Sequence, residues 1–308
     1  ATELTAIGYS ALGSCTEGLS NTAVGEGSFG TLTDGDHNCG LGGYAGYGTT
    51  GSRNTYLGHY AGVYASSTDD CIAIGKSALA GVSGDKVTGN YNIAIGNYTL
   101  DATTSGNANV AIGYQTLTAV TTAAGNVAVG SSCGAALTGA TNTLIGHQAG
   151  YYATSINDCV AVGRNALIGD GSTAPTGDYN IAIGSYAGDA ITTGDKNVLA
   201  GHQAGTELLA GGNNVLLGYQ TGDSLINASS SVAIGSYALS TEDVSAGNVA
   251  IGYQALQDQN VDNANNVAVG YQSALNLTSG TDSVYVGYQA GGVGAVSYTH
   301  LRAHETGR

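Results

Sequence analysis

The chain has 308 residues, of which 51 are glycine, and it holds one proline, one phenylalanine and no tryptophan or methionine. Only 9% of its residues are charged, and 22 acidic residues against 7 basic ones give a net charge of −15. Long helices need Leu, Glu, Lys and Met in quantity, collagen needs Gly at every third position, and duplex nucleic acid needs a cationic partner. No apolar run approaches eighteen residues, so we expect no membrane span, no nucleic-acid partner and no helical enzyme.

A short motif, Asn-x-Ala-(Ile/Val)-Gly, recurs along the chain, for example at 92–96 and 248–252. Its closing glycines follow one another at intervals of 17 residues, with exceptions of 16 twice, 18 once and 21 twice. These repeat glycines are Gly8, Gly25, Gly42, Gly58, Gly75, Gly96, Gly113, Gly130, Gly146, Gly163, Gly184, Gly201, Gly218, Gly235, Gly252, Gly270 and Gly287. Seventeen copies with almost no chain between them indicate one repeat array over residues 1–295.

The three residues before each repeat glycine read as a strand. A β-branched residue stands three positions before the glycine in every copy but Cys39, an aliphatic residue stands one position before it, and Ala stands between them in eleven copies. Alternation of this kind is strand periodicity. We expect the β-branched and aliphatic side chains to form the apolar face, and the Ala face to be flat and open to close approach by another chain.

The residues after each repeat glycine read as a second short strand and a polar loop. The third position after the glycine is always small, and the fourth is Leu or Gly in all copies but two. A unit this short cannot bury its own face, but stacked copies can pair at about 4.8 Å per coil. The predicted fold is therefore all-β, a narrow parallel β-solenoid of about 17 coils of about 17 residues, with two short strands per coil.

Asparagine stands four residues before the repeat glycine in twelve copies, and identical asparagines can stack as a hydrogen-bonded ladder. The predicted ladder residues are Asn21, Asn38, Asn54, Asn92, Asn109, Asn126, Asn142, Asn180, Asn197, Asn214, Asn248 and Asn266.

Tyrosine and glutamine gather one or two residues after the repeat glycine. We interpret the tyrosines as candidate surface-contact residues, which could bind a cell-surface glycan or protein receptor. The alternative, which we favour by analogy with Asn/Gln and aromatic ladders, is that this column stabilises the stack or a seam between chains. The candidates are Tyr44, Tyr60, Tyr98, Tyr114, Tyr186, Tyr219, Tyr237, Tyr253, Tyr271 and Tyr288.

The repeat resembles two known groups of sequences. Asn-x-Ala-Ile-Gly followed by a small residue is similar to the head repeats of trimeric autotransporter adhesins, and Gly-Tyr-Gln-Ala-(Gly/Leu), at 252–256 and 287–291, resembles repeat regions of phage tail fibres. The coil of 17 residues is longer than the usual adhesin-head repeat. The resemblance implies a left-handed β-roll, assembly as a homotrimer, and a place outside the cell or on a virion surface. We expect the Ala/Gly face to form the trimer contact.

A longer period of 88 residues lies over the short one. Residues 58–79 and 146–167 match at thirteen of twenty-two positions, and each segment is followed by a 21-residue unit with an extra loop, at 80–89 and 168–177. Such insertions often serve binding in solenoids. The alternative is drift after a duplication, which we favour slightly.

Sites for chemistry do not stand out from the repeat. Residues 25–30 fit a dinucleotide-binding pattern, but a loop follows where that site needs a helix. The five cysteines have no C-x-x-C spacing, and we interpret them as small buried residues. We interpret the acidic residues in the loops as a solvated edge and not as a calcium site. We therefore expect no enzyme, no cofactor and no metal.

The ends of the chain break the pattern. The sequence begins inside a repeat, and residues 296–308 resemble the translation of a sequencing-library adaptor, so we expect a gene fragment with a non-native tail. The function expected for 1–295 is a structural fibre or adhesin shaft on a virion or extracellular filament. The alternatives are the head of a bacterial trimeric surface adhesin and, with less support, a carbohydrate- or ice-binding solenoid.

Overall fold

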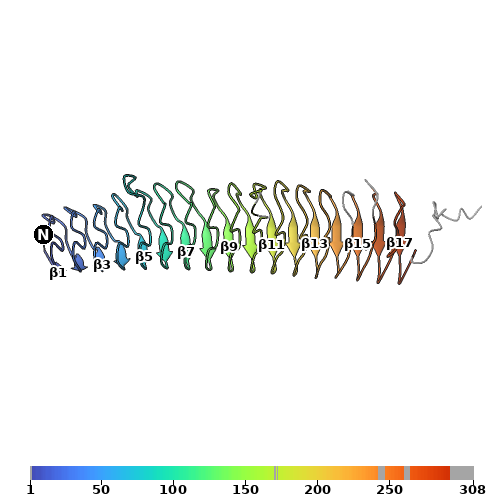
Figure 1. The fold of residues 1–308 in the computed structure, drawn as a ribbon, viewed down its shortest axis with the longest axis horizontal. Helices are drawn as coiled ribbons and strands as arrows, with labels where there is room; N and C mark the ends of the chain where they lie inside the picture. The colour runs from blue at the N-terminus through green and yellow to red at the C-terminus, as the bar shows by residue number, and fades with distance from the viewer. Residues whose placement is uncertain (1, 170, 172, 242–246, 260–263, 292–308) are drawn as a thin grey trace, which may run out of the picture. The chain divides into compact units, whose positions relative to one another are not determined.

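A computed structural model describes residues 2–169, 171, 173–241, 247–259 and 264–291 of the chain (Figure 1). The predicted fold class is confirmed, because the described residues form a parallel β-solenoid and contain no helix. Its strands recur about every 17 residues. The chain divides into two compact units, Ala1–Thr192 and Thr193–Arg308, which are taken separately below. The adaptor-like tail, 296–308, lies outside the described residues.

Every described strand has three residues and lies immediately before a repeat glycine. In the first unit the strands are β1 (Thr5–Ile7), β2 (Thr22–Val24), β3 (Cys39–Leu41), β4 (Thr55–Leu57), β5 (Ile72–Ile74), β6 (Ile93–Ile95), β7 (Val110–Ile112), β8 (Val127–Val129), β9 (Thr143–Ile145), β10 (Val160–Val162) and β11 (Ile181–Ile183). In the second unit they are β12 (Val198–Ala200), β13 (Val215–Leu217), β14 (Val232–Ile234), β15 (Val249–Ile251), β16 (Val267–Val269) and β17 (Val284–Val286).

Within each unit the strands pair in parallel and in register with the repeat. Val110 of β7 lies opposite Val127 of β8, and Val232 of β14 lies opposite Val249 of β15. Each repeat position therefore forms a column along the stack, and equivalent side chains of successive coils are neighbours. In Figure 1 the arrows of each unit lie side by side and point the same way.

The second strand predicted in each coil does not form in the described residues, and that part of the prediction is wrong. The chain after the repeat glycine makes a run of turns instead, with left-handed backbone at Tyr98 (φ 57°) and Leu100 (φ 50°). Alternate left-handed residues prevent an extended backbone, although the turn run still bonds the next coil, as when the Leu100 amide donates to the Thr116 carbonyl at 3.0 Å. Leu117 (φ 52°) and Gly134 (φ 57°), each the fourth residue after its repeat glycine, both have left-handed backbone. Because Gly adopts this conformation readily, it often replaces Leu at this position.

The alternation within the strands is correct, but the assignment of their faces is wrong. Outside the two end coils, the central residue of the strand points into the coil, and Ala128 is fully buried, while Val127 and Val129 beside it are only half-buried. The Ala face that we expected to meet another chain is therefore the interior of the solenoid. The β-branched and aliphatic columns face outward, and Ile112 and Ile183 are 37% and 45% exposed.

The reason is the narrow interior, in which the strand centre and the fourth residue after the repeat glycine lie against each other. Where Ala fills the strand centre, the fourth residue after the glycine is usually a large one, such as Leu117. Where Leu144 fills it, that fourth residue is Gly150, at which an added Cβ would lie 3.1 Å from the Leu144 Cδ1. Tyr56 and Gly62 make the same exchange, with a hypothetical Cβ 2.9 Å from the tyrosine ring. In such coils the sizes of these two side chains are therefore balanced.

The five cysteines divide between the two faces. Cys71, Cys133 and Cys159 are buried, as the sequence predicts, but Cys39 is exposed because its column faces outward, and Cys15 is partly exposed. All five are free thiols. Burial raises the pKa of Cys133 to about 12 and the pKa values of Cys71 and Cys159 to about 11.

These environments predict a selective thiol reaction. At pH 8 a thiol reagent is expected to label Cys39 in the folded chain, whereas Cys71, Cys133 and Cys159 react only after denaturation, because the thiolate is the reactive form and is disfavoured inside the coil. Mass spectrometry of the labelled peptides checks this. Rapid labelling of Cys133 in the folded chain would contradict the inward placement of its column.

Candidate functional site: the side-chain columns of the solenoid

The predicted asparagine residues lie inside the coils, not on the surface. Asn38 is 1% exposed and Asn54 is fully buried. The Asn38 side-chain amide donates to the Asn21 Oδ1 at 3.1 Å, and the Asn54 amide donates to the Asn38 Oδ1 at the same distance. Each Oδ1 also accepts the backbone N–H of the next asparagine, at 2.8 and 2.9 Å. The column is a ladder whose side chains bond the neighbouring coil.

The same ladder occurs in both units. In the first unit, Asn92, Asn109, Asn126 and Asn142 are linked by side-chain bonds of 3.1 to 3.2 Å. In the second, the Asn214 amide donates to the Asn197 Oδ1 at 3.0 Å. Where Cys71 and Cys159 replace asparagine, the sulfur accepts the next backbone amide, at 3.5 Å from Asn92 and 3.3 Å from Asn180. Asn248 and Asn266 continue the column, joined by a 2.8 Å bond to the Asn266 N–H.

The tyrosine column of the second unit forms a continuous aromatic stack. Its successive ring centroids, from His202 through Tyr219, Tyr237, Tyr253 and Tyr271 to Tyr288, are 5.5, 5.4, 6.0, 5.3 and 5.3 Å apart. The last two pairs are nearly parallel, at 19° and 8°. Because both faces of Tyr271 lie against neighbouring rings, Tyr271 leaves mainly its ring edge to solvent, whereas the last ring, Tyr288, is 73% exposed.

A glutamine ladder runs beside the aromatic stack. The Gln272 amide donates to the Gln254 Oε1 at 2.7 Å, and the Gln289 amide donates to the Gln272 Oε1 at 2.8 Å. Gln220 and Gln203 form the same bond at 3.2 Å. These amides bond each other along the axis, which is the arrangement that joins one coil to the next.

The tyrosines of the first unit are interrupted. Tyr44 and Tyr60 pair at 5.5 Å, and Tyr98 and Tyr114 pair at 6.3 Å. The coil between these pairs has Ser77 in the column. Two cations of this acidic chain lie over tyrosine rings in equivalent coils: the Lys76 Nζ is 5.3 Å from the centroid of Tyr98, and the Arg164 Cζ is 4.8 Å from that of Tyr186.

The histidines and the dinucleotide-like segment carry no arrangement for chemistry. His59, His147 and His202 are exposed at the first position after the repeat glycine. The segment 25–30 forms turns followed by the loop to the next coil, with no helix. Across the described ranges no three His, Cys, Asp or Glu side chains are grouped as a metal would need, and no helix is long and apolar enough to cross a membrane.

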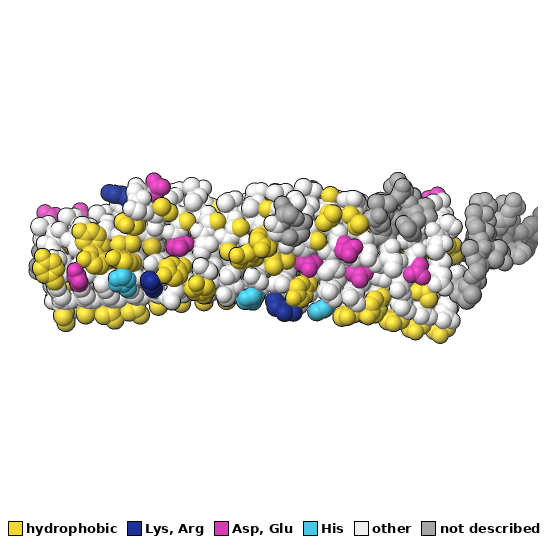
Figure 2. Space-filling model, viewed as in Figure 1, with side chains coloured by type: hydrophobic (Ala, Val, Ile, Leu, Met, Phe, Trp, Pro, Cys, Tyr) yellow, Lys and Arg dark blue, Asp and Glu magenta, His cyan; other side chains and the backbone are white. Residues whose placement is uncertain are grey.

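The outward strand face is the surface that sequence reasoning missed. In the described strands, every outward residue is Thr, Val, Ile, Leu, Ala or Cys, so this face has no charge in either unit. Figure 2 shows that the viewed side of the molecule also carries few, scattered acidic groups. The pairing of a large strand-centre residue with a glycine six positions later, as in Leu199 with Gly205, was the signal that could have identified the inward column.

Comparison with known proteins adds no relative. No protein-family model matches this chain, and no curated protein matches it.

Proposed function

We propose that this chain is a non-catalytic structural shaft of an extracellular or virion fibre, which assembles side by side with copies of itself and carries attachment to a surface receptor. The observation that supports this proposal is the outward strand face, which is apolar or hydroxylated and uncharged in both units of a chain with net charge −15. The repeat resemblance favours three copies per assembly. The alternative function is the head of a bacterial trimeric surface adhesin.

Charge favours a second copy of the chain as the occupant of this face. Two copies with the same strong negative charge repel one another wherever their acidic loops meet. Association of like chains therefore needs a face without acidic groups, and the strand face meets that condition in every described coil. The interior Ala column, which we first expected to form this contact, is buried and unavailable.

The area of the face in the first unit is a large part of what an interface needs. Eleven strands at about 4.8 Å spacing and about 10 Å width give roughly 500 Å² in the first unit. Six strands give roughly 300 Å² in the second. A stable interface buries about 800 Å² per partner, so the face of the first unit alone supplies more than half of that area.

The test places a charge on this face. Ile112→Lys with Ile145→Lys, at residues 37% and 40% exposed, is expected to convert the wild-type oligomer into a monomer, because two desolvated ammonium groups oppose association. Light scattering coupled to size-exclusion chromatography measures the mass, and circular dichroism checks that the fold is kept.

The matched control is Ser105→Lys, on an exposed loop of the same unit, which is expected to leave the oligomer intact. A monodisperse monomer for the wild-type chain at tens of micromolar would overturn self-assembly. So would a double lysine variant that keeps the wild-type mass.

A further inference from the structure

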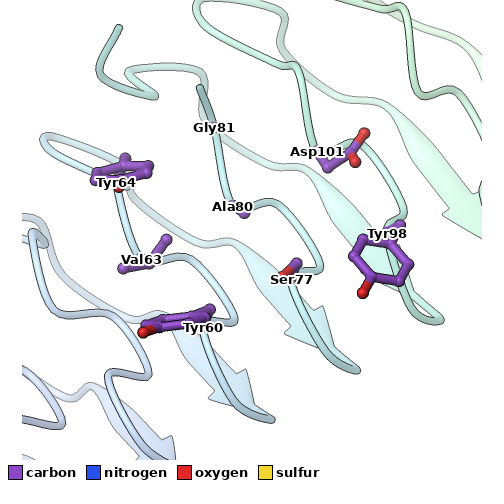
Figure 3. A pocket seen from close by; sticks show the side chains of 8 residues that line it. All are labelled: Tyr60, Val63, Tyr64, Ser77, Ala80, Gly81, Tyr98 and Asp101. Carbon is purple, nitrogen blue, oxygen red and sulfur yellow. The ribbon is translucent and has the colours of Figure 1, made fainter. Parts of the chain in front are cut away.

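A pocket of about 360 Å³ opens on the first unit across three consecutive coils (Figure 3). It is lined by Tyr60, Val63, Tyr64, Ser77, Ala80, Gly81, Tyr98 and Asp101. Figure 3 shows the two tyrosines of the coil after β4 on one side, Tyr98 and Asp101 of the coil after β6 on the other, and the small residues of the middle coil between them. The volume lies at the lower end of the range for small-molecule sites.

The pocket exists because the middle coil lacks large side chains. Ser77 stands in the column that holds Tyr60 and Tyr98 in the neighbouring coils, so one ring is missing from the aromatic column. Ala80 and Gly81 then begin the extra loop of the 21-residue unit. Gly81 has φ +73°, and a Cβ there would lie 2.7 Å from the Val87 side chain. The loop therefore folds back and leaves the space above the middle coil open.

The lining combines aromatic rings with one carboxyl group. Tyr60 and Tyr64 are 38% and 39% exposed, so their rings are accessible from the pocket. Asp101 is half-buried, and burial raises its pKa. A ligand that fits this surface needs an apolar C–H face to lie against tyrosine and hydroxyl groups to donate to the carboxyl oxygens. A pyranose ring has both.

Only part of this lining recurs 88 residues later in the same unit. Tyr64, Gly81, Tyr98 and Asp101 have Tyr152, Gly169, Tyr186 and Asp189 as their equivalents. In contrast, Tyr60, Ser77 and Ala80 are replaced by Gln148, Asn165 and Ile168. The later coils therefore do not repeat the small middle coil on which the pocket depends.

We propose that this pocket binds one neutral hexopyranose residue of a surface glycan. The aspartate and the net charge of −15 oppose acidic sugars, and the cation beside the pocket, Lys76, already lies over the Tyr98 ring. The proposal names the receptor class for the attachment role proposed above and rests on that role. No lining residue belongs to a strand, so binding here does not use the face assigned to self-assembly.

The experiment uses saturation-transfer NMR on the full chain with the methyl glycosides of glucose, galactose, mannose and N-acetylglucosamine, and with the methyl glycoside of sialic acid as the acidic probe. At least one neutral glycoside is expected to receive saturation at its ring C–H protons, and the sialoside to receive none. Asp101→Asn is expected to weaken binding about tenfold through loss of charge-assisted hydrogen bonds. Tyr98→Ala removes one wall of the pocket and is expected to weaken binding at least as much.

The matched control is Asp85→Asn, an exposed carboxyl on the extra loop that does not line the pocket, which is expected to bind like wild type. No signal from any neutral glycoside, an equal signal from the sialoside, or equal weakening by Asp85→Asn would each overturn the proposal. The Ile112→Lys, Ile145→Lys variant separates the two proposals: it keeps glycoside binding if the pocket is correct, whatever the outcome for self-assembly.

Discussion

Replacing Gly42 by alanine is expected to unfold the coils around β3, whereas the same change at the next residue, Gly43, is expected to cost less than about 1 kcal/mol. Gly42 has φ +138°, and an added Cβ would lie 2.6 Å from the carbonyl oxygen of Gly58 in the next coil. At Gly43 the backbone has no positive φ, and the nearest atom is the His59 Cδ2 at 3.2 Å, which can move away.

Two costs add at Gly42. The backbone conformation is one that only glycine adopts readily, which costs about 1 to 3 kcal/mol for another residue. The contact is with backbone, which cannot move without breaking the bond from the Gly58 N–H to the Leu41 carbonyl, 2.8 Å long. Together they exceed about 4 kcal/mol, a loss seen only for severe defects. Because each coil is stabilised by its neighbours, the defect weakens the coils on both sides.

Urea unfolding followed by circular dichroism measures both variants. Gly42→Ala should lower the midpoint strongly or prevent folding, and Gly43→Ala should leave the midpoint near that of wild type. Equal midpoints for the two variants would contradict the argument that the repeat glycine is required by the approach of the next coil's backbone.

The repeat period and register could be predicted from sequence, but the faces of the strand could not be predicted from alternation alone. A three-residue strand alternates in the same way whichever side is buried, and Val-Ala-Ile reads naturally as two core residues around a small one. The choice is made by volume across the coil, as with Tyr56 opposite Gly62 and Leu144 opposite Gly150. Comparing columns six residues apart would have shown it.

The turn run in place of a second strand was missed for a different reason. Leu100 and Leu117 adopt left-handed backbone, which is uncommon for residues other than Gly, Asn and Asp. Nothing in the pattern of small residue followed by leucine distinguishes such a turn from a short apolar strand. The glycines that share the leucine column, such as Gly46 and Gly134, were the local sign of it.

The tyrosine column could be recognised in the sequence, but the pocket could not. The pocket depends on the ring that is missing from the coil of Ser77. Ser77 is unremarkable in a column that also holds Gln148 and Asn165. The space it leaves becomes visible only when Tyr60 and Tyr98 are placed on the coils either side. The 88-residue period had marked both extra loops, yet it gave no reason to connect them with an aspartate twenty residues further on.

The asparagine ladder gives the second large effect, through three variants of Asn109 with an expected order of stability. Asn109 is fully buried, its Oδ1 accepts the Asn126 N–H at 3.0 Å, and its amide donates to the Ala123 carbonyl at 3.0 Å and to the Asn92 Oδ1 at 3.2 Å. Asn109→Ala leaves the Asn126 N–H and the Ala123 carbonyl unsatisfied in the interior, while the Asn92 Oδ1 keeps its bond from the backbone N–H of residue 109. The variant is expected to cost about 3 kcal/mol.

Serine provides the matched control because the chain itself uses it in this column. The Asn248 N–H donates to the Ser231 Oγ at 3.3 Å, so a hydroxyl can still accept the next coil's amide. Asn109→Ser is therefore expected to be less destabilising than Asn109→Ala. Urea midpoints at pH 7 test the order, and a serine variant as weak as the alanine variant would show that the ladder acts through packing and not through its hydrogen bonds.

Asn109→Asp is expected to be the least stable variant at pH 7 and to recover in acid. The aspartate is nearly the same size as asparagine, but its carboxylate places an acceptor against two acceptors, the Ala123 carbonyl and the Asn92 Oδ1. Burial and these acceptors raise its pKa in the folded chain above the value of about 3.9 in the unfolded chain. The stabilising contribution of the protonated carboxyl is therefore fully present below the unfolded-state pKa and is lost as the pH rises through the folded-state pKa.

Urea midpoints of the aspartate variant should therefore approach those of wild type near pH 4, where the protonated carboxyl donates again, and fall steadily toward pH 7. A midpoint that does not change relative to wild type over this range would mean that the carboxylate reaches solvent, and that the interior ladder opens more readily than its hydrogen bonds imply.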